Sequence, residues 1–280
     1  MTTELGHAAQ SQNGAVPHGA PQPGQQAPRW PVWYGPAAFF AGLVATLLAV
    51  SLIRAVATGL PDDSPGIELG GTLVQDSFFV IAAIAFAAMT ARPRAWHFGV
   101  RSAPFVRTLL LAALTLVVFL VFLRAYTWIL HPNGQQSVAK DLGADKGGLD
   151  MVLGGILVIA LAPAAEEFFF RGFFYRALRS RFPVIAAAII DGLVFGAIHY
   201  TDPKTLSLLP ILAVLGFIFC LLYEWTGTLF ATIALHTINN AAAYGSTVHS
   251  AKTLSAGLGV GAVAIWLLLL RTLPRPATPR

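Results

Sequence analysis

Two adjacent carboxylates inside an apolar run are the first residues of this chain that could do chemistry. Glu166 and Glu167 stand in the sequence AAEEFFFR, which ends at Arg171. In a helix, Glu167 and Arg171 lie four residues apart in the order that favours an ion pair on one face. Glu166 points about 100° away from that face and has no local partner. The pattern predicts a structural role for Glu167 and a chemical role for Glu166. The alternative is that both carboxylates only cap or solvate a helix end.

A histidine on the following apolar segment can reach the same depth as Glu166. His199 ends the sequence FGAIH. We expect the two segments to form an antiparallel hairpin that turns near Phe182 and Pro183. Glu166 lies 16 residues before Phe182 and His199 lies 16 residues after Pro183, so both are about 24 Å from the turn. The counting predicts that Glu166 and His199 meet, although a lone histidine near a helix end can also be an interfacial residue.

A third polar element stands later in the chain. His236 and Asn240 belong to the sequence HTINN, and their spacing of four residues puts both on one face of a helix. Such residues can simply join helices through hydrogen bonds. Three separate polar elements on neighbouring helices, however, indicate a common site.

The residue types in these elements support peptide hydrolysis. A carboxylate beside a neutral imidazole can activate water as a general base and later return the proton. A second imidazole and an amide can hold the oxyanion of a tetrahedral intermediate. One glutamate and two histidines, here Glu166, His199 and His236, also match the ligand set of a catalytic zinc. Residue types leave both mechanisms open, and no HExxH motif favours zinc.

The composition shows what kind of protein must position these groups. Of 280 residues, 56% are hydrophobic and 11% are charged, whereas a soluble domain has about 45–50% and about 25%. This composition excludes a water-soluble globule. The single cysteine, Cys220, excludes a disulfide scaffold. Basic clusters interleaved with aromatic residues are absent, which excludes a nucleic-acid-binding surface.

The fold class predicted is an all-α polytopic transmembrane bundle of about eight helices. A spanning helix needs roughly 20 apolar residues. The segments that fit, of which the fifth and sixth are short, are residues 36–57, 70–90, 106–130, 149–170, 184–200, 206–223, 226–245 and 254–270.

Arginines cluster on one side of these segments. They follow the second, fourth and eighth segments or end them, whereas the alternate loops mix acidic residues with lysines. The positive-inside rule therefore predicts that both termini are cytoplasmic.

The predicted domain organisation is a single helical domain with two tails. Residues 1–31 are rich in Gly, Gln, Pro and Ala, so we expect a disordered tail. This tail lacks the basic and apolar regions of a signal peptide. Residues 32–272 form the helical domain, its motif-bearing core spans residues 151–245, and residues 273–280 form a short tail.

In chain order, the three polar elements resemble the motifs of the CPBP family. This family comprises CAAX proteases and bacteriocin-processing enzymes and includes the type II CAAX prenyl endopeptidases. The motifs are EExxxR at residues 166–171, FxxxH at residues 195–199 and HxxxN at residues 236–240. The resemblance covers residues 151–245, and the sequence FGVR at residues 98–101 resembles a short motif often found before the third helix.

The resemblance implies a role for each motif residue. Glu166 and His199 would activate the water, and His236 and Asn240 would stabilise the oxyanion. The ion pair between the second glutamate and the arginine of EExxxR would support the site. The family has been described both as metalloproteases and as glutamate-dependent proteases, and we favour the metal-free mechanism.

Other polar residues are expected to have structural or interfacial roles rather than catalytic ones. Asp191 departs from the motifs and is a candidate either for the partner of a buried arginine or for a group that supports the site residues, without a catalytic role. Asp76, Arg54 and Arg124 stand near segment ends and are predicted to be interfacial. Cys220 is predicted to be a core residue, since no basic residue stands near it in the sequence.

The sequence therefore predicts an intramembrane endopeptidase acting on a membrane-associated protein or peptide. Its Ala-, Gly- and Pro-rich composition indicates a bacterial plasma membrane, where prenylated substrates are less expected than other peptides. No cofactor is expected unless the zinc alternative holds, and nucleic acid is not an expected partner. A non-catalytic binding or immunity scaffold is the main rival function. A proton-relaying transporter is disfavoured by the absence of internal repeats.

Overall fold

The fold is seen in a computed structural model that describes residues 27–57, 59, 64–132, 138–201, 203–247 and 251–274. These described residues form helices and no strands, which confirms the all-α prediction. Residues 1–26 and 275–280, the larger parts of the two predicted tails, lie outside the described residues. The elements are α1 (Tyr34–Val56), α2 (Pro65–Ala88), η1 (Ala95–Phe98), α3 (Phe105–Leu130), α4 (Val138–Asp141), α5 (Gly148–Ile156), η2 (Leu157–Leu161), α6 (Ala162–Phe169), η3 (Phe170–Phe174), α7 (Tyr175–Arg179), α8 (Val184–Ala197), η4 (Pro203–Leu208), α9 (Leu209–Thr226), α10 (Leu229–Thr247) and α11 (Lys252–Thr272).

All eight predicted segments are helical, but they are not equally suited to a bilayer. In the described part of the chain, 6 helices are long and apolar enough to cross a membrane. The two segments that fall short are α8, which has 14 residues, and α10, which carries the polar residues of the third motif. Most of α10 is buried between its neighbours, so its surface does not need the apolar composition of a lipid-facing helix.

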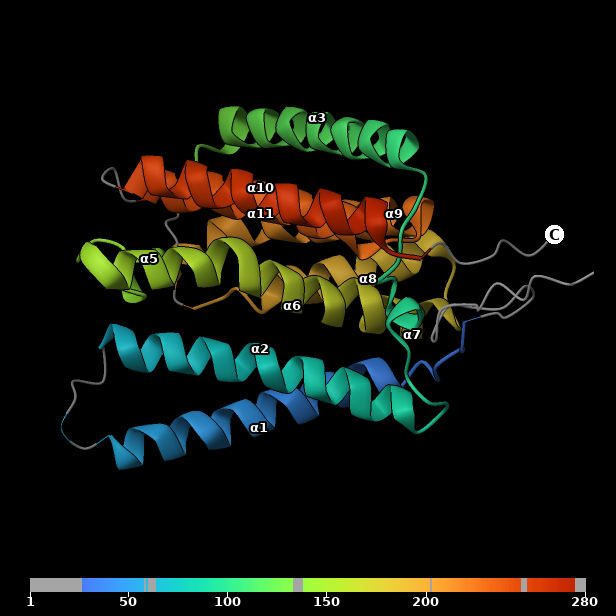
Figure 1. Ribbon diagram of the computed structural model, residues 1–280, viewed down its shortest axis with the longest axis horizontal. Coiled ribbons are helices and arrows are strands. Elements are labelled where there is room, and N and C mark those ends of the chain that lie inside the picture. The colour runs from blue at the N-terminus through green and yellow to red at the C-terminus, as the bar shows by residue number, and fades with distance from the viewer. Residues whose placement is uncertain are drawn as a thin grey trace, which may run out of the picture.

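The helices pack in pairs around one central helix (Figure 1). The helix α1 packs against α2, α8 against α9, and α10 against α11, while α2 also contacts α6. The long helix α3 lies on the outside, against α9 and α10. The elements from α5 to α7 form one continuous helix, Gly148–Arg179, and this helix carries the paired carboxylates.

Two π-helical turns interrupt this central helix on either side of the carboxylates. The first is η2 and the second is η3. In the first turn, the Ala162 N–H bonds to the carbonyl of Leu157. The next residue, Pro163, has no N–H to offer. The carbonyl of Val158 is therefore available to a side chain from another helix. Such turns occur frequently at functional sites.

Glycines let α8 and α9 approach each other closely. A Cβ atom at Gly192 would lie 2.6 Å from the carbonyl oxygen of Ala213, and one at Gly196 would lie 2.8 Å from that of Leu209. Small residues at helix contacts are typical of membrane bundles. This contact brings α9 next to the central helix, where the Gly216 carbonyl faces Arg171.

The end of the predicted N-terminal tail belongs to the packed core. Trp30 is 1% exposed, and its ring lies 5.1 Å from the ring of Phe98 and 5.0 Å from that of Phe173. A large aromatic side chain buries enough apolar area to order its neighbours, so the folded chain begins before residue 32.

Candidate active site

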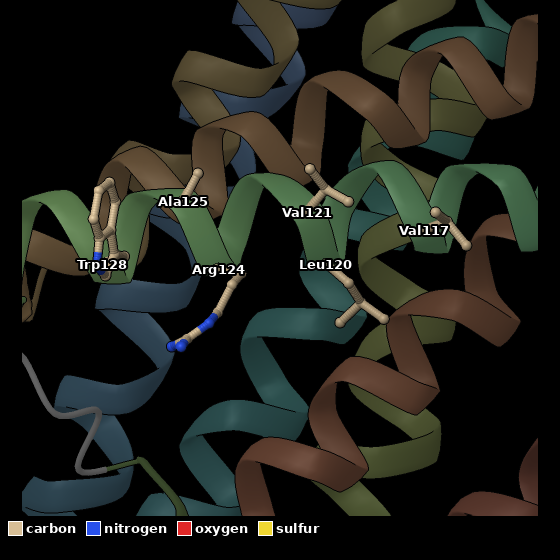
Figure 2. Close-up of a pocket in the computed structure, with 6 residues that line it drawn as sticks. All are labelled: Val117, Leu120, Val121, Arg124, Ala125 and Trp128. Atoms are coloured by element: carbon tan, nitrogen blue, oxygen red, sulfur yellow. The ribbon is translucent and has the colours of Figure 1, made fainter.

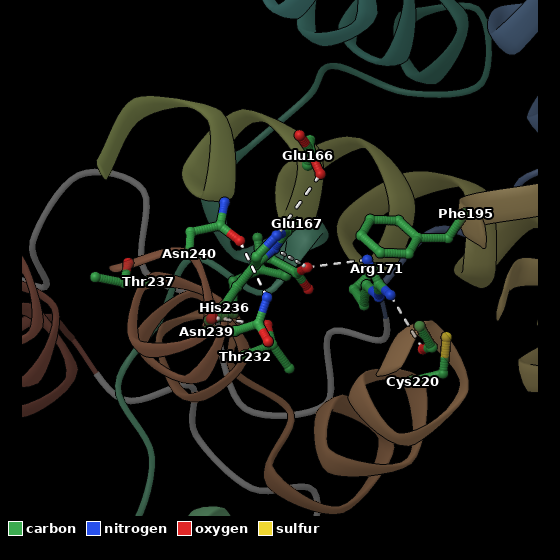
Figure 3. A network of polar contacts seen from close by, with 12 residues as sticks. Glu166, Glu167, Arg171, Phe195, Cys220, Thr232, His236, Thr237, Asn239 and Asn240 are labelled. Carbon is green, nitrogen blue, oxygen red and sulfur yellow. Dashed lines mark hydrogen bonds and ion pairs between the residues drawn. The ribbon is translucent and has the colours of Figure 1, made fainter. Parts of the chain in front are cut away.

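One cavity brings together the residues of all three motifs. It has a volume of about 360 Å³, and its lining includes Glu166, His199, His236 and Asn240. These residues come from α6, from the turn after α8, and from α10. Further lining residues come from α2 and α4. Figure 3 shows the polar contacts around Glu166, His236 and Asn240.

The two adjacent carboxylates have opposite surroundings, and Glu167 is the structural one. Its side chain is fully buried, and its Oε1 accepts a hydrogen bond from Arg171 Nη1 at 2.9 Å. The same oxygen lies 2.9 Å from His236 Nδ1. The predicted pair of Glu167 with Arg171 is confirmed, and His236 is a second partner that the helix spacing did not predict.

Arg171 is held on several sides within the core. Its Nη2 donates to the carbonyl of Gly216 at 3.0 Å, and its Nε lies 3.7 Å from Asp191 Oδ1. Its guanidinium also lies 4.4 Å from the centre of the Phe195 ring, a cation–π distance. The expectation that Asp191 partners a buried arginine is confirmed.

Cys220 completes this buried group. The thiol is fully buried and donates to Asp191 Oδ1 at 3.1 Å. Figure 3 shows Cys220 near Arg171. The prediction of a core cysteine is confirmed. Its position behind Arg171, outside the cavity lining, gives it no direct access to a substrate.

Glu166 faces the cavity instead of the core. Its side chain is 21% exposed, and its Oε2 lies 3.8 Å from His236 Nε2. That oxygen has no hydrogen-bond partner in the structure. Oε2 itself is buried, and the exposed remainder of the side chain lies at the cavity wall, where a carboxylate can bind and deprotonate a water molecule.

The two imidazoles are oriented by their Nδ1 atoms. His199 Nδ1 lies 2.7 Å from the carbonyl oxygen of Phe195, so Nδ1 must carry the proton and donate it. In the same way, Glu167 Oε1 accepts a hydrogen bond from His236 Nδ1, so this Nδ1 also carries the proton. When neutral, both rings therefore present Nε2 as an acceptor, since only one ring nitrogen is protonated.

The nearest imidazole contact of Glu166 is with His236 rather than with His199. The described contacts include none between Glu166 and His199, so the expected direct meeting of these two residues is not seen. The counting assumed uninterrupted α-helices, but η3 interrupts the central helix and α8 ends at Ala197. Both residues still line the same cavity.

Asn240 is positioned by the first π-helical turn. Its Nδ2 donates to the free carbonyl of Val158 at 2.9 Å, and its Oδ1 accepts from Asn239 Nδ2 at 3.2 Å. The amide of Asn240 is thus fixed at the cavity wall. A second N–H on the same nitrogen is left for a substrate atom.

Asp76 is a site residue that the sequence did not predict. It was expected at the membrane interface, but it is 8% exposed and lines the same cavity as Glu166. Its Oδ2 has no hydrogen-bond partner. The expectation is wrong because α2 begins at Pro65, so that Asp76 lies mid-helix. The sequence signal that could have identified Asp76 as a site residue was the four-residue spacing of Glu68, Thr72 and Asp76, which places the three on one face of the helix.

Arg54 and Arg124 lie away from the cavity. Arg54 is exposed and pairs with Glu68 at 3.3 Å. Arg124 is exposed on α3 and lines an apolar surface groove whose other lining residues, Trp128 among them, belong to the same helix (Figure 2). Neither arginine lines the cavity, and Arg54 contacts it only through Glu68.

The described residues do not fit a zinc site. No group of three or more His, Cys, Asp or Glu side chains in the described part of the chain is arranged to hold a metal ion. In particular, Glu166, His199 and His236 share the cavity without converging on one point.

The comparisons with known proteins point to a protease family. Residues 148–242 match the model of the family described as type II CAAX prenyl endopeptidase Rce1-like. This match spans the central helix and both histidine motifs, and it confirms the resemblance found in the sequence. No curated protein and no solved structure matched the chain. The match covers 95 of the 280 residues, and the matched family is described by its prenyl endopeptidase activity.

Proposed function

We propose that this chain, given its match to the Rce1-like prenyl endopeptidases, is an intramembrane endopeptidase in which Glu166 activates the attacking water. The observation that carries the proposal is the contrast between two neighbouring carboxylates. Glu167 is fully buried and bonded to Arg171 and His236. Glu166 has an unused oxygen and lines a cavity with the other motif residues.

The first step is attack of water on the scissile carbonyl. Glu166 takes a proton from the water as its oxygen attacks the carbonyl carbon, and His199 Nε2 accepts the other water hydrogen and orients it. When the tetrahedral intermediate collapses, Glu166 returns its proton to the departing amine. A carboxylate that serves as base and then as acid needs no covalent intermediate.

The oxyanion requires hydrogen-bond donors on the opposite side of the carbonyl. The free N–H of Asn240 Nδ2 is one donor. His236 Nε2 is the second donor if the ring enters the reaction as an imidazolium, with its extra proton taken from solvent before the attack, and the buried carboxylate of Glu167 beside Nδ1 compensates that charge. Removal of one such donor typically reduces kcat by a factor of about 100–1,000.

The cavity favours peptide segments over free C-terminal carboxylates. Its described lining contains no lysine or arginine and the carboxylates of Glu68, which is paired with Arg54 outside the lining, and of Asp76, Asp141 and Glu166. A substrate that ends in a carboxylate inside this cavity would be repelled. We therefore place the substrates among membrane-associated peptides or protein segments, with prenylated C termini disfavoured, and the enzyme in a bacterial plasma membrane.

The test is cleavage of a quenched-fluorescent peptide library by the purified full chain in lipid nanodiscs. Wild type, Glu166→Gln and Asp145→Asn are compared, the last as a matched neutralisation of an exposed carboxylate outside the cavity. The proposal predicts cleavage by wild type and Asp145→Asn and none by Glu166→Gln. A strong chelator should leave the wild-type rate unchanged.

Two outcomes would contradict the proposal. Loss of wild-type cleavage on adding the chelator, restored by zinc, would favour the metalloprotease alternative with Glu166, His199 and His236 as ligands. Absence of cleavage by a folded wild-type protein across all peptides would favour a binding or immunity scaffold.

A further inference from the structure

A second cavity lies at the arginine-rich end of the bundle. It has a volume of about 450 Å³ and shares no lining residue with the candidate active site. It is formed by the chain before α1, the loop after η1, α7 and the end of α9. Its described charged lining residues are Arg29, Arg101, Arg176, Arg179 and Glu224.

The single carboxylate in this lining is already engaged. Glu224 Oε1 accepts from Arg179 Nη2 at 2.9 Å, and Glu224 Oε2 accepts from the Tyr175 hydroxyl at 2.9 Å. Arg179 also donates to the Phe182 carbonyl at 2.9 Å. Glu224 therefore neutralises Arg179 and leaves the positive charge of the other arginines uncompensated by the described lining.

Two of the remaining arginines are fixed in place. Arg101 Nε donates to the Gly227 carbonyl at 2.6 Å, and the Arg101 carbonyl accepts from the Thr228 hydroxyl at 2.7 Å. Arg176 lies over the buried Trp30 ring, 5.0 Å from its centroid. These contacts hold the guanidinium groups at the cavity wall without supplying a negative charge.

The electrostatics of Arg101 favour a bound anion. Burial lowers the pKa of Arg101, Tyr223 opposes this shift, and the neighbouring Arg176 charge adds to it. Buried cations without a counter-charge are costly. An anion placed between Arg101 and Arg176 would reduce this cost.

We propose that this cavity binds a phosphate group, either on an acidic phospholipid headgroup or as free phosphate. Planar guanidinium groups match phosphate oxygens through paired hydrogen bonds. The cavity lies at the ends of the apolar helices, which is the level of lipid headgroups in a bilayer. The inference rests on this cavity alone and does not depend on the proposed protease activity.

The test is calorimetric titration of the purified full chain in a neutral detergent. The probes are dioctanoyl phosphatidylglycerol, dioctanoyl phosphatidylcholine and inorganic phosphate. The double variant Arg29→Gln, Arg176→Gln should bind the anionic probe about tenfold or more weakly, since each basic contact contributes on the order of 1 kcal/mol. Arg107→Gln and Arg181→Gln are matched controls, because both residues are exposed and lie outside the cavity.

The single variant Arg29→Gln keeps the test decisive if loss of Arg176 disturbs the packing of Trp30. Arg29 is exposed and precedes α1, so this variant should fold and still bind more weakly than wild type. Phosphatidylglycerol binding that excess phosphate does not displace would assign the site to a lipid. Binding of inorganic phosphate with displacement of the lipid would assign it to free phosphate. Equal binding of the two lipids with no phosphate binding, or unchanged affinity in the arginine variants, would overturn the proposal.

Discussion

Replacement of Glu167 by glutamine should separate the structural carboxylate from the chemical one. The substitution preserves shape and removes the charge that Arg171 contacts at 2.9 Å. Arg171 would keep only Asp191, at 3.7 Å, as a carboxylate partner. Loss of one partner from a fully buried ion pair costs about 3–5 kcal/mol. At about 2–4 °C per kcal/mol for a chain of this size, Tm should fall by roughly 6–20 °C.

Thermal unfolding in one detergent, followed by tryptophan fluorescence, measures this loss. Glu166→Gln is the matched control, because it changes the adjacent residue in the same way and Glu166 Oε2 has no hydrogen bond to lose, only a contact with His236 at 3.8 Å. Arg171→Met should destabilise the protein as much as Glu167→Gln does, since it leaves the carboxylates of Glu167 and Asp191 without their cation. Equal Tm values for Glu166→Gln and Glu167→Gln would refute the division of roles between the two glutamates.

Three further substitutions test other parts of the structure. Asp76→Leu should raise stability by about 1–3 kcal/mol, because it removes an unpartnered buried polar group, and it should lower peptide cleavage because Asp76 lines the active-site cavity; a loss of stability would contradict this. His97 lies outside the spanning helices, and burial, with the charges of Arg176 and Arg94, lowers its pKa to about 4. The unfolded chain therefore binds an extra proton between about pH 6.5 and about pH 4, so Tm should fall as the pH falls through this window, and should fall less in His97→Gln. Gly99→Ala should lower Tm by several degrees, because Gly99 has a φ of +90° and a Cβ atom there would lie 2.5 Å from the Tyr223 ring; an unchanged Tm would show that this loop is not constrained.

The sequence was sufficient where local spacing determines the contact. The spacing of four residues between Glu167 and Arg171 predicted their ion pair, and this pair is seen. The expectation that Asp191 would partner a buried arginine also holds. The three polar motifs line one cavity because each belongs to a separate helix of the same bundle.

The sequence was insufficient where the backbone departs from a regular helix. The π-helical turn η3 changes the register of the central helix between Glu166 and the turn, and α8 ends before His199, so equal counting did not bring Glu166 and His199 into contact. Pro163 was the visible signal of the first turn, because a residue without an N–H leaves a carbonyl unpaired. The partner of that carbonyl, Asn240, comes from a distant helix and could be found only in three dimensions.

Hydropathy alone was also a poor guide to the burial of single residues. Asp76 was expected at a helix end because the start of α2 was placed at residue 70 instead of Pro65. Trp30 was assigned to a tail because the residues before it are rich in Gly, Gln, Pro and Ala, yet it is buried against Phe98 and Phe173. Both errors concern tertiary packing, which local composition does not encode.

The most direct test of the central claim is the single-turnover cleavage rate of one defined peptide by wild type and by Glu166→Gln in the same nanodiscs. If Glu166 is the general base, the cleavage rate of Glu166→Gln should be about 100- to 10,000-fold lower than that of wild type, while the Tm of the variant stays close to that of wild type. A folded Glu166→Gln protein that cleaves the peptide as fast as Asp145→Asn would contradict the account.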